Sequence, residues 1–141
     1  MTVVVRGAGD GPFPTEVDAS GHRFTADEPV DAGGGNTGPA PYDLLLAALG
    51  ACTAMTVRLY AGRRGWPLQG VTVTLDHDRI HAQDCADCMT KEGRLDRISL
   101  ALQLTGDLTP DQRGQLLEVA RRCPVHRTLT SELVVDLKPA G

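Results

Sequence analysis

Two of the four cysteines in the chain, Cys85 and Cys88, lie three positions apart in the segment HAQDCADC. His77 and His81 precede them, so the four side chains match the number and type of ligands in a tetrahedral zinc site. On an extended strand, however, the two histidines would lie about 13 Å apart, and both reach one ion only if the chain turns between them. The segment therefore contains a candidate zinc site formed by His77, His81, Cys85 and Cys88.

The same segment has two further interpretations. A redox-active pair of the thioredoxin type usually sits where a strand turns into a helix, and no such transition follows here. The surrounding acids would also oppose formation of a thiolate, and they are Asp76, Asp78, Asp84 and Asp87. The third interpretation is a solvated hairpin connection, for which the following residues TKEG are suited. Metal site, auxiliary thiol pair and plain loop all stay open at this point.

Cys52 lies in the middle of an apolar segment that we expect to form a long helix over residues 41–65. Pro41 suits the first helical position, and Gly65 suits the position after the end. Residues 44–54 are almost all apolar or small, and a helix that is apolar all round is buried all round. A small domain has few places to bury such a helix, so we expect a second subunit to cover part of it.

The spacing of residues along this helix predicts one inner face that includes Cys52. Its members recur at intervals of three and four residues, and they are Leu45, Leu49, Cys52, Thr56 and Leu59. From this pattern alone, Cys52 is a small buried apolar residue, as free cysteines often are.

Cys123 has a different setting, in ARRCPVHRTLT. The residue before a proline is disfavoured in a helix, so one helix must break at Cys123 and a second begins at Pro124. Backbone N–H groups at a helix start and nearby cations both stabilise a thiolate. The cations close in sequence are Arg121, Arg122, His126 and Arg127. This setting favours a reactive thiol.

The remaining pattern predicts an α+β fold in a single domain, residues 1–141. A glycine- and proline-rich loop, residues 31–41, separates the first strands from the long helix. Alternating apolar residues and turn residues predict strands at 2–6, within 14–28 on either side of an SG turn, and at 70–81, 94–106 and 133–137. Helices are predicted at 108–123, with Thr109 as cap, and at 124–132.

Composition excludes several classes of function. The formal net charge is −4 with no basic stripe, so we expect no nucleic-acid partner. We see no apolar run that approaches the ~20 residues of a membrane helix, and so expect no membrane partner. The N-terminal residues lack the pattern of a signal peptide, which points to the cytoplasm. Cysteines there are more often catalytic, metal-bound or inert than permanently cross-linked.

The segments GPAPYDLLLAALGACTAMTVRLYA and RCPVHRTL resemble the two cysteine motifs of the OsmC/Ohr family of thiol-dependent hydroperoxide reductases. The resemblance implies an intertwined homodimer in which antiparallel sheets wrap long central helices. It also implies a cysteine-dependent peroxidase in which Cys52 attacks a small organic hydroperoxide and Cys123 resolves the product as a disulfide. No prosthetic group is required, and the reductant would be a dithiol, either lipoyl-type or a small thiol.

The chain departs from the family pattern near the start of the long helix. Family members pair the attacking cysteine with an arginine from the N-terminal strands and with a glutamate in an N-P-E motif. Here the corresponding residues read APYD, so that Tyr42 takes the glutamate's position and Asp43 follows it. The resemblance makes Asp43 a candidate for the carboxylate, and Arg23, ahead of Arg6, a candidate for the arginine.

These departures, together with the additional Cys85 and Cys88, keep a second function open. A protein with the same fold could bind a small apolar ligand at the dimer interface, or a metal through HAQDCADC, without catalysing a reaction. Turnover of a hydroperoxide separates the two hypotheses.

Overall fold

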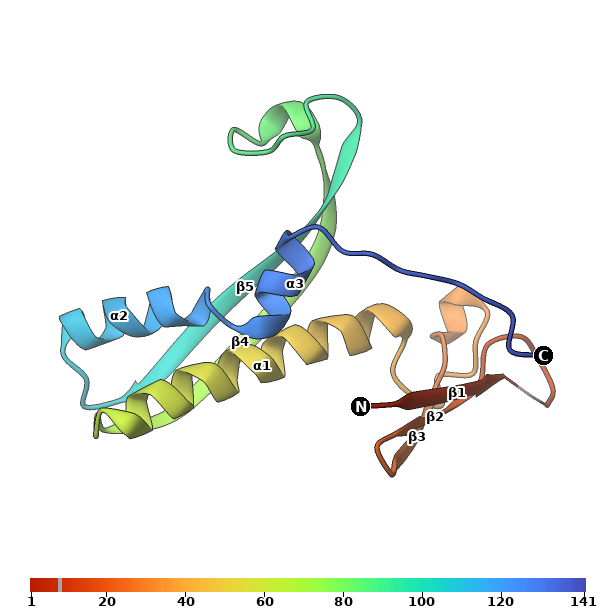
Figure 1. The fold of residues 1–141 in the computed structure, drawn as a ribbon, viewed down its shortest axis with the longest axis horizontal. Helices are drawn as coiled ribbons and strands as arrows, with labels where there is room; N and C mark the ends of the chain where they lie inside the picture. Colours follow the sequence, from red (N-terminus) through yellow and green to blue (C-terminus); the bar gives the residue numbers. More distant parts are fainter. Residues whose placement is uncertain (8) are drawn as a thin grey trace. The chain divides into compact units, whose positions relative to one another are not determined.

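The computed structural model describes residues 1–7 and 9–141, and the chain divides into two compact units, Met1–Ala47 and Ala48–Gly141 (Figure 1). Position 8, in the turn predicted after the first strand, lies outside the described residues. Each unit is described separately below. The single domain expected from the sequence stays a prediction.

The first unit contains a three-stranded antiparallel sheet in the order β1 (Val3–Gly7), β2 (Thr15–Ala19) and β3 (His22–Ala26). The turn between β2 and β3 has φ of 54° at Ser20 and 90° at Gly21. Two consecutive positive φ angles are the geometry of the tight turn that matches the twist of a hairpin. The hairpin and turn predicted within residues 14–28 are therefore confirmed.

The glycine-rich loop after β3 is built around one buried carboxylate. Asp27 is only 2% exposed, and it accepts hydrogen bonds from the backbone N–H groups of Glu28 (2.8 Å), Gly35 (3.1 Å) and Thr37 (3.1 Å). The Thr37 hydroxyl donates a fourth bond, at 2.7 Å. A side chain at Gly38 would overlap the carbonyl oxygen of Thr25, so glycine permits the close return of the chain to β3. The loop is thus an ordered structure around Asp27.

Helix α1 (Pro41–Arg63) begins in the first unit and continues into the second. In the second unit it is followed by the antiparallel hairpin of β4 (Leu68–His81) and β5 (Arg94–Gly106), whose connection includes the short 3-10 helix η2 (Ala82–Asp84). Helices α2 (Pro110–Ala120) and α3 (Pro124–Thr130) complete it. These elements confirm the predicted α+β class, the long helix, the second hairpin and the helix break.

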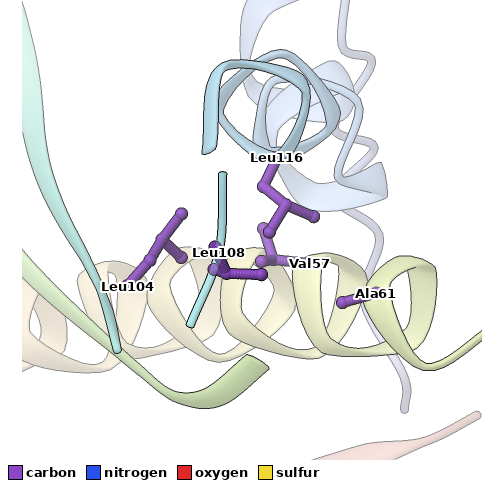
Figure 2. Packing of buried hydrophobic residues seen from close by; sticks show 5 residues of the cluster. All are labelled: Val57, Ala61, Leu104, Leu108 and Leu116. Carbon is purple, nitrogen blue, oxygen red and sulfur yellow. The ribbon is translucent and has the colours of Figure 1, made fainter. Parts of the chain in front are cut away.

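The core of the second unit joins α1 to β5 and α2. Figure 2 shows Leu116 of α2 pointing towards Val57 of α1, with Leu108 beside Val57. Its buried members are Val57, Ala61, Leu104, Leu108 and Leu116. Along the same helix, a Cβ at Gly50 would lie 2.7 Å from a methyl carbon of Leu75, so this glycine lets α1 pack directly on β4.

The inner face of α1 differs from the predicted one by about one residue. Its buried residues are Leu49, Gly50, Thr53, Val57 and Ala61. Leu45 and Leu59, which were expected on this face, are 37% and 55% exposed, and Cys52 is half-buried. Since apolar residues occupy nearly every position of α1, spacing alone could not identify the side that meets β4 and α2.

The outer face of α1 is apolar and exposed. The helix has 23 residues, and its most apolar window has a mean hydropathy of 1.6, so by length and composition it could cross a membrane. This corrects the statement that no apolar run approaches that length. Buried helices of soluble proteins also meet these two criteria, which therefore assign no membrane. Only 28% of this window is buried within the chain itself.

The predicted strand at residues 133–137 is wrong for this structure, in which residues 132–141 form neither helix nor strand. Leu133, Val134, Val135 and Leu137 are between 57% and 99% exposed. A strand is stable only when a neighbouring strand supplies hydrogen bonds and a packed face. In the described sheets, this segment pairs with no strand.

Asp27→Asn is expected to destabilise the protein at neutral pH. The Thr37 hydroxyl bond is the main reason that the pKa of Asp27 is lowered. Burial acts to raise this pKa, but the hydroxyl bond and the three N–H bonds together outweigh it. The stabilisation is therefore complete above the carboxyl's ordinary pKa and is lost as the pH falls through its lowered value. Thermal unfolding should be measured from neutral to acidic pH. The difference in melting temperature between wild type and Asp27→Asn should become smaller as the pH falls.

Asp31→Asn is the matched control for this measurement. Asp31 lies exposed in the same loop and accepts none of the four bonds. If the difference in melting temperature between wild type and Asp27→Asn stays constant across the pH range, the stabilising role of the ionised Asp27 carboxylate is contradicted.

Candidate functional site

The break between α2 and α3 places Cys123 at the start of a helix. Thr109 and Gln112 form a reciprocal cap at the start of α2, and this helix ends at Ala120. Cys123 is the N-cap of α3, and its Sγ accepts a hydrogen bond from the backbone N–H of His126 at 3.3 Å. A sulfur thus takes the role that a serine or aspartate oxygen usually has at this position.

The same sulfur lies against helix α1. The hydroxyl oxygen of Thr53 lies 3.8 Å from Cys123 Sγ and 2.8 Å from the carbonyl oxygen of Leu49. Cys52, on the preceding residue of α1, lies close enough to Cys123 for each thiol to shift the pKa of the other. The two cysteines singled out by the sequence motifs therefore meet in the structure, and both are free thiols.

The two thiols differ in acidity. Burial raises the pKa of Cys52, and its neighbour Cys123 raises it further, against the opposing N–H of Val125. Burial also acts to raise the pKa of Cys123, but hydrogen bonds from Cys52, the His126 N–H and the Thr53 hydroxyl outweigh it and lower the pKa. Neutral donors account for these bonds, whereas the sequence pattern suggested cations. Cys123 is therefore the more acidic thiol of the pair.

A cavity of about 250 Å³ lies next to two residues that bond to Cys123, although neither cysteine is among its lining residues. Thr53 and His126, which both bond to Cys123, form part of its wall. The other lining residues are mainly apolar, and they are Leu100, Leu102, Leu117, Ala120 and Arg121. The cavity can hold a small apolar molecule with one polar end beside Thr53 and His126.

The predicted Arg23 and Asp43 have other partners within the first unit. The Nε of Arg23 lies 3.3 Å from a carboxylate oxygen of Asp18, and the arginine side chain is 72% exposed. A carboxylate oxygen of Asp43 accepts the backbone N–H of Ala40 at 2.9 Å, at the beginning of α1. Their roles towards Cys52 stay predictions.

The four residues of the candidate zinc site are not gathered around one point. Cys85 and Cys88 form a disulfide, and His77 lies 2.9 Å from a carboxylate oxygen of Asp96 on the opposite strand. His77 and His81 both belong to β4, which does not turn between them. Within residues 1–7 and 9–141, no three His, Cys, Asp or Glu side chains form a group that could hold a metal. Zinc at this segment stays a prediction, one that requires the disulfide to open.

Sequence reasoning missed Thr53 and the cavity residues from β5 and α2. The interval of four residues from Leu49 to Thr53 and then to Val57 was a usable signal for Thr53, because it marks one face of a helix. Leu100, Leu102 and Leu117 carry no signal in the sequence that separates them from other core leucines.

Replacing either cysteine should change the acidity of the other in opposite directions. Cys52→Ala removes a donor to Cys123 and should raise the pKa of Cys123. Cys123→Ala removes a group that raises the pKa of Cys52 and should therefore lower it. Ultraviolet thiolate absorbance followed against pH measures both, because Cys85 and Cys88 do not titrate while they are disulfide-bonded.

Thr53→Val provides the control for this titration, because it removes the hydroxyl and keeps both cysteines. It should raise the pKa of Cys123. A wild-type protein in which Cys52 ionises first would contradict the assignment.

Comparison with solved structures shows which fold the chain adopts. An OsmC-like protein from Mycoplasma pneumoniae aligns with a TM-score of 0.70 and 20% identity over 91% of this chain and 85% of its own. A putative osmotic stress induced and detoxification response protein from Psychrobacter arcticus aligns with a TM-score of 0.69 and 22% identity, over 90% of this chain and 86% of its own. An organic hydroperoxide resistance protein from Legionella pneumophila aligns with a TM-score of 0.64 and 19% identity, over 94% of this chain and 92% of its own. The chain thus has the same fold as these proteins.

Curated proteins give no match to this sequence. The family model described as OsmC-like protein matches residues 33–138, which include α1, both free cysteines and the β4–β5 hairpin. Since this match covers most of the chain, the protein belongs to the OsmC-like family.

Proposed function

We propose that the protein is a cytoplasmic cysteine-dependent peroxidase that reduces organic hydroperoxides in oxidative-stress defence. The observation that carries the proposal is the proximity of the free thiols of Cys52 and Cys123, next to a small apolar cavity whose wall includes Thr53 and His126. Two similar structures, from Legionella pneumophila and Bacillus subtilis, are described as organic hydroperoxide resistance proteins. A dithiol, lipoyl-type or small, would restore both thiols.

The reaction requires only the two sulfurs and a proton donor. The Cys52 thiolate attacks one oxygen of the weak O–O bond, so that an S–O bond forms and the alkoxide departs, taking a proton to become an alcohol. Cys52 is then a sulfenic acid. The Cys123 thiolate attacks this sulfur, an S–S bond forms and water leaves. Two electrons from the external dithiol then open the disulfide.

The opposite pKa shifts of the two thiols fit the second step better than the first. The lowered pKa of Cys123 provides a thiolate ready to resolve the sulfenic acid, whereas the raised pKa of Cys52 opposes its attack. A cation near Cys52 would remove this obstacle. We assign this role to Arg23, oriented by Asp43. The assignment rests on the family pattern and on the electrostatic requirement.

Peroxide consumption tests the proposal directly. Purified protein should consume cumene hydroperoxide in the presence of dihydrolipoamide. Cys52→Ser should lower turnover by about two orders of magnitude or more. Cys123→Ser should complete one turnover and then accumulate over-oxidised Cys52, detectable by mass spectrometry. Arg23→Ala should raise the pH at which activity appears, because Cys52 would then ionise only at a higher pH.

Cys85→Ala/Cys88→Ala is the matched control for loss of cysteines, and it should keep the turnover with this small reductant. Turnover that survives Cys52→Ser would contradict the order of the two thiols. No turnover by the wild type would contradict the peroxidase proposal. That result would favour a binding protein that holds a small apolar ligand in the cavity of about 250 Å³.

We propose further that the protein is a homodimer. Met55 and Leu59 are one turn apart on α1 and are 68% and 55% exposed, and Tyr42 near its start is 56% exposed. A helix this apolar is stable in water only when another surface covers it. A second copy of the chain would supply that surface.

Light scattering coupled to size-exclusion chromatography should give twice the chain mass of 15.0 kDa. Met55→Glu/Leu59→Glu should shift the protein to monomer, because burying two carboxylates in an apolar interface is strongly unfavourable. Gln115→Glu, at an exposed site on α2, should leave the dimer intact. A monomeric wild type at micromolar concentration would exclude the dimer.

A further inference from the structure

The connection between β4 and β5 contains a disulfide that takes no part in the proposed peroxidase reaction. Cys85 and Cys88 are bonded and half-buried, and Met89 beside them is 99% exposed. Of the residues from 82 to 93, which we name the hairpin tip, only Ala82 is fully buried. Figure 1 shows the tip extending beyond helices α1, α2 and α3. The disulfide thus lies in a largely exposed segment and is separate from the buried core of the second unit.

The hairpin tip is also separate from the thiol pair at α3. The cavity beside Cys123 is lined on β5 by Leu100 and Leu102, whereas β5 begins at Arg94. Six residues of extended strand cover about 20 Å. Sulfur atoms must come into contact for exchange, so the disulfide at the tip cannot react with Cys52 or Cys123 of its own chain in this conformation.

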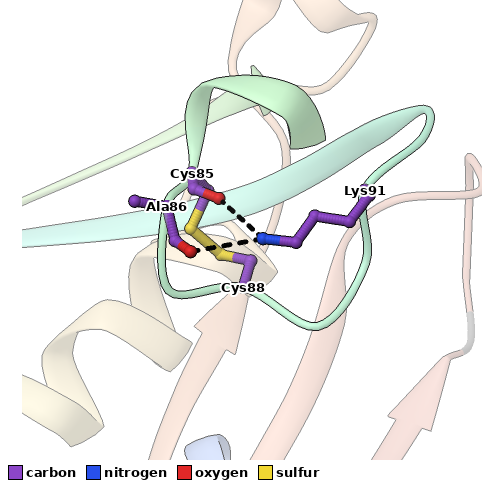
Figure 3. Close-up of a disulfide and its surroundings, with 4 residues drawn as sticks. All are labelled: Cys85, Ala86, Cys88 and Lys91. Carbon is purple, nitrogen blue, oxygen red and sulfur yellow. Dashed lines mark hydrogen bonds between the residues drawn. A yellow bond between two sulfur atoms is a disulfide. The ribbon is translucent and has the colours of Figure 1, made fainter.

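The local charges of the tip are mainly negative. An aspartate directly precedes each cysteine, Asp84 before Cys85 and Asp87 before Cys88, and Glu92 adds a third acid. The single lysine, Lys91, donates to the carbonyl oxygens of Cys85 (3.4 Å) and Ala86 (3.2 Å), as Figure 3 shows. Its ammonium group thereby holds the disulfide loop. An anionic thiol approaching this loop is repelled, whereas an uncharged or cationic one is not.

We propose that Cys85 and Cys88 form a second dithiol–disulfide centre, which exchanges with an uncharged or cationic external dithiol independently of Cys52 and Cys123. One thiolate of that dithiol attacks a tip sulfur, the Cys85–Cys88 bond breaks and a mixed disulfide forms. The second thiol of the external molecule then displaces the remaining tip sulfur. Two electrons and two protons pass to the tip, and the external dithiol becomes a disulfide.

The test uses Cys52→Ser/Cys123→Ser, in which the tip holds the two remaining cysteines, and it requires no peroxide. The protein is incubated with dihydrolipoamide, alkylated and mapped by mass spectrometry. Both Cys85 and Cys88 should become alkylated, and adding oxidised lipoamide before alkylation should restore the disulfide. Wild type should behave identically at these two positions. Failure of the proposed peroxidase function would leave this result unchanged.

Charge selectivity provides the second part of the test. Dihydrolipoate carries a carboxylate in place of the amide, so at low salt it should reduce the tip about threefold or more slowly than dihydrolipoamide. The difference should disappear at high salt and in Asp84→Asn/Asp87→Asn, which removes the adjacent charges. Circular dichroism confirms that each variant is folded.

Three results would overturn the proposal. The first is a tip that stays oxidised under excess dithiol, or that does not re-form its disulfide afterwards. The second is reduction of the tip in wild type but not in Cys52→Ser/Cys123→Ser, because the centre would then depend on the other pair. The third is purified protein in which Cys85 and Cys88 are thiolates bound to stoichiometric zinc.

Discussion

The contact of the Cys123 sulfur with helix α1 is the interaction on which the second unit depends. One sulfur atom lies 3.8 Å from the Thr53 hydroxyl oxygen and 3.3 Å from the His126 nitrogen, and it interacts with the Cys52 thiol. The rest of the unit holds the start of α3 in a fixed position against α1. Gly50 allows α1 to pack closely against Leu75 of β4. Leu116 packs α2 into the same core as α1, and the chain after α2 leads to Cys123. A leucine core thus sets the geometry of two thiols.

This arrangement explains why neighbouring sulfurs can have different chemistry. Cys123 is fully buried and Cys52 is half-buried, and burial acts to raise the pKa of each. The difference comes from the direction of their hydrogen bonds, because Cys123 receives several donors and Cys52 acts as one of them. Acidity at this site is therefore a property of the pair and of the backbone of α3, and cannot be assigned to either residue alone.

Much of this organisation was predictable from the sequence, because it depends on local signals. Pro41 and Gly65 bounded the long helix, Thr109 and Pro110 started α2, and Pro124 fixed the break at Cys123. Signals of this kind act within one turn of chain. The two cysteine motifs then brought Cys52 and Cys123 together through resemblance to a family.

The errors arose where a long-range partner decides the outcome. The face of α1 that is buried depends on β4 and α2, so the uniformly apolar helix gave no reliable stripe. Residues 133–137 have strand-forming side chains but no strand beside them in the described sheets. The partner of His77 also depends on the opposite strand, because this histidine pairs with Asp96 across the hairpin.

The position of Cys123 as the cap of α3 couples the oxidation state of the protein to its secondary structure. A free thiol or thiolate accepts the His126 N–H and completes the first turn of a seven-residue helix. When that sulfur joins another in a disulfide, it loses its negative charge and becomes a much weaker acceptor. The proposed Cys52–Cys123 disulfide would therefore weaken the cap of α3, and a helix this short has little other stabilisation of its own. The helical structure of α3 would thus depend on whether the two sulfurs are reduced.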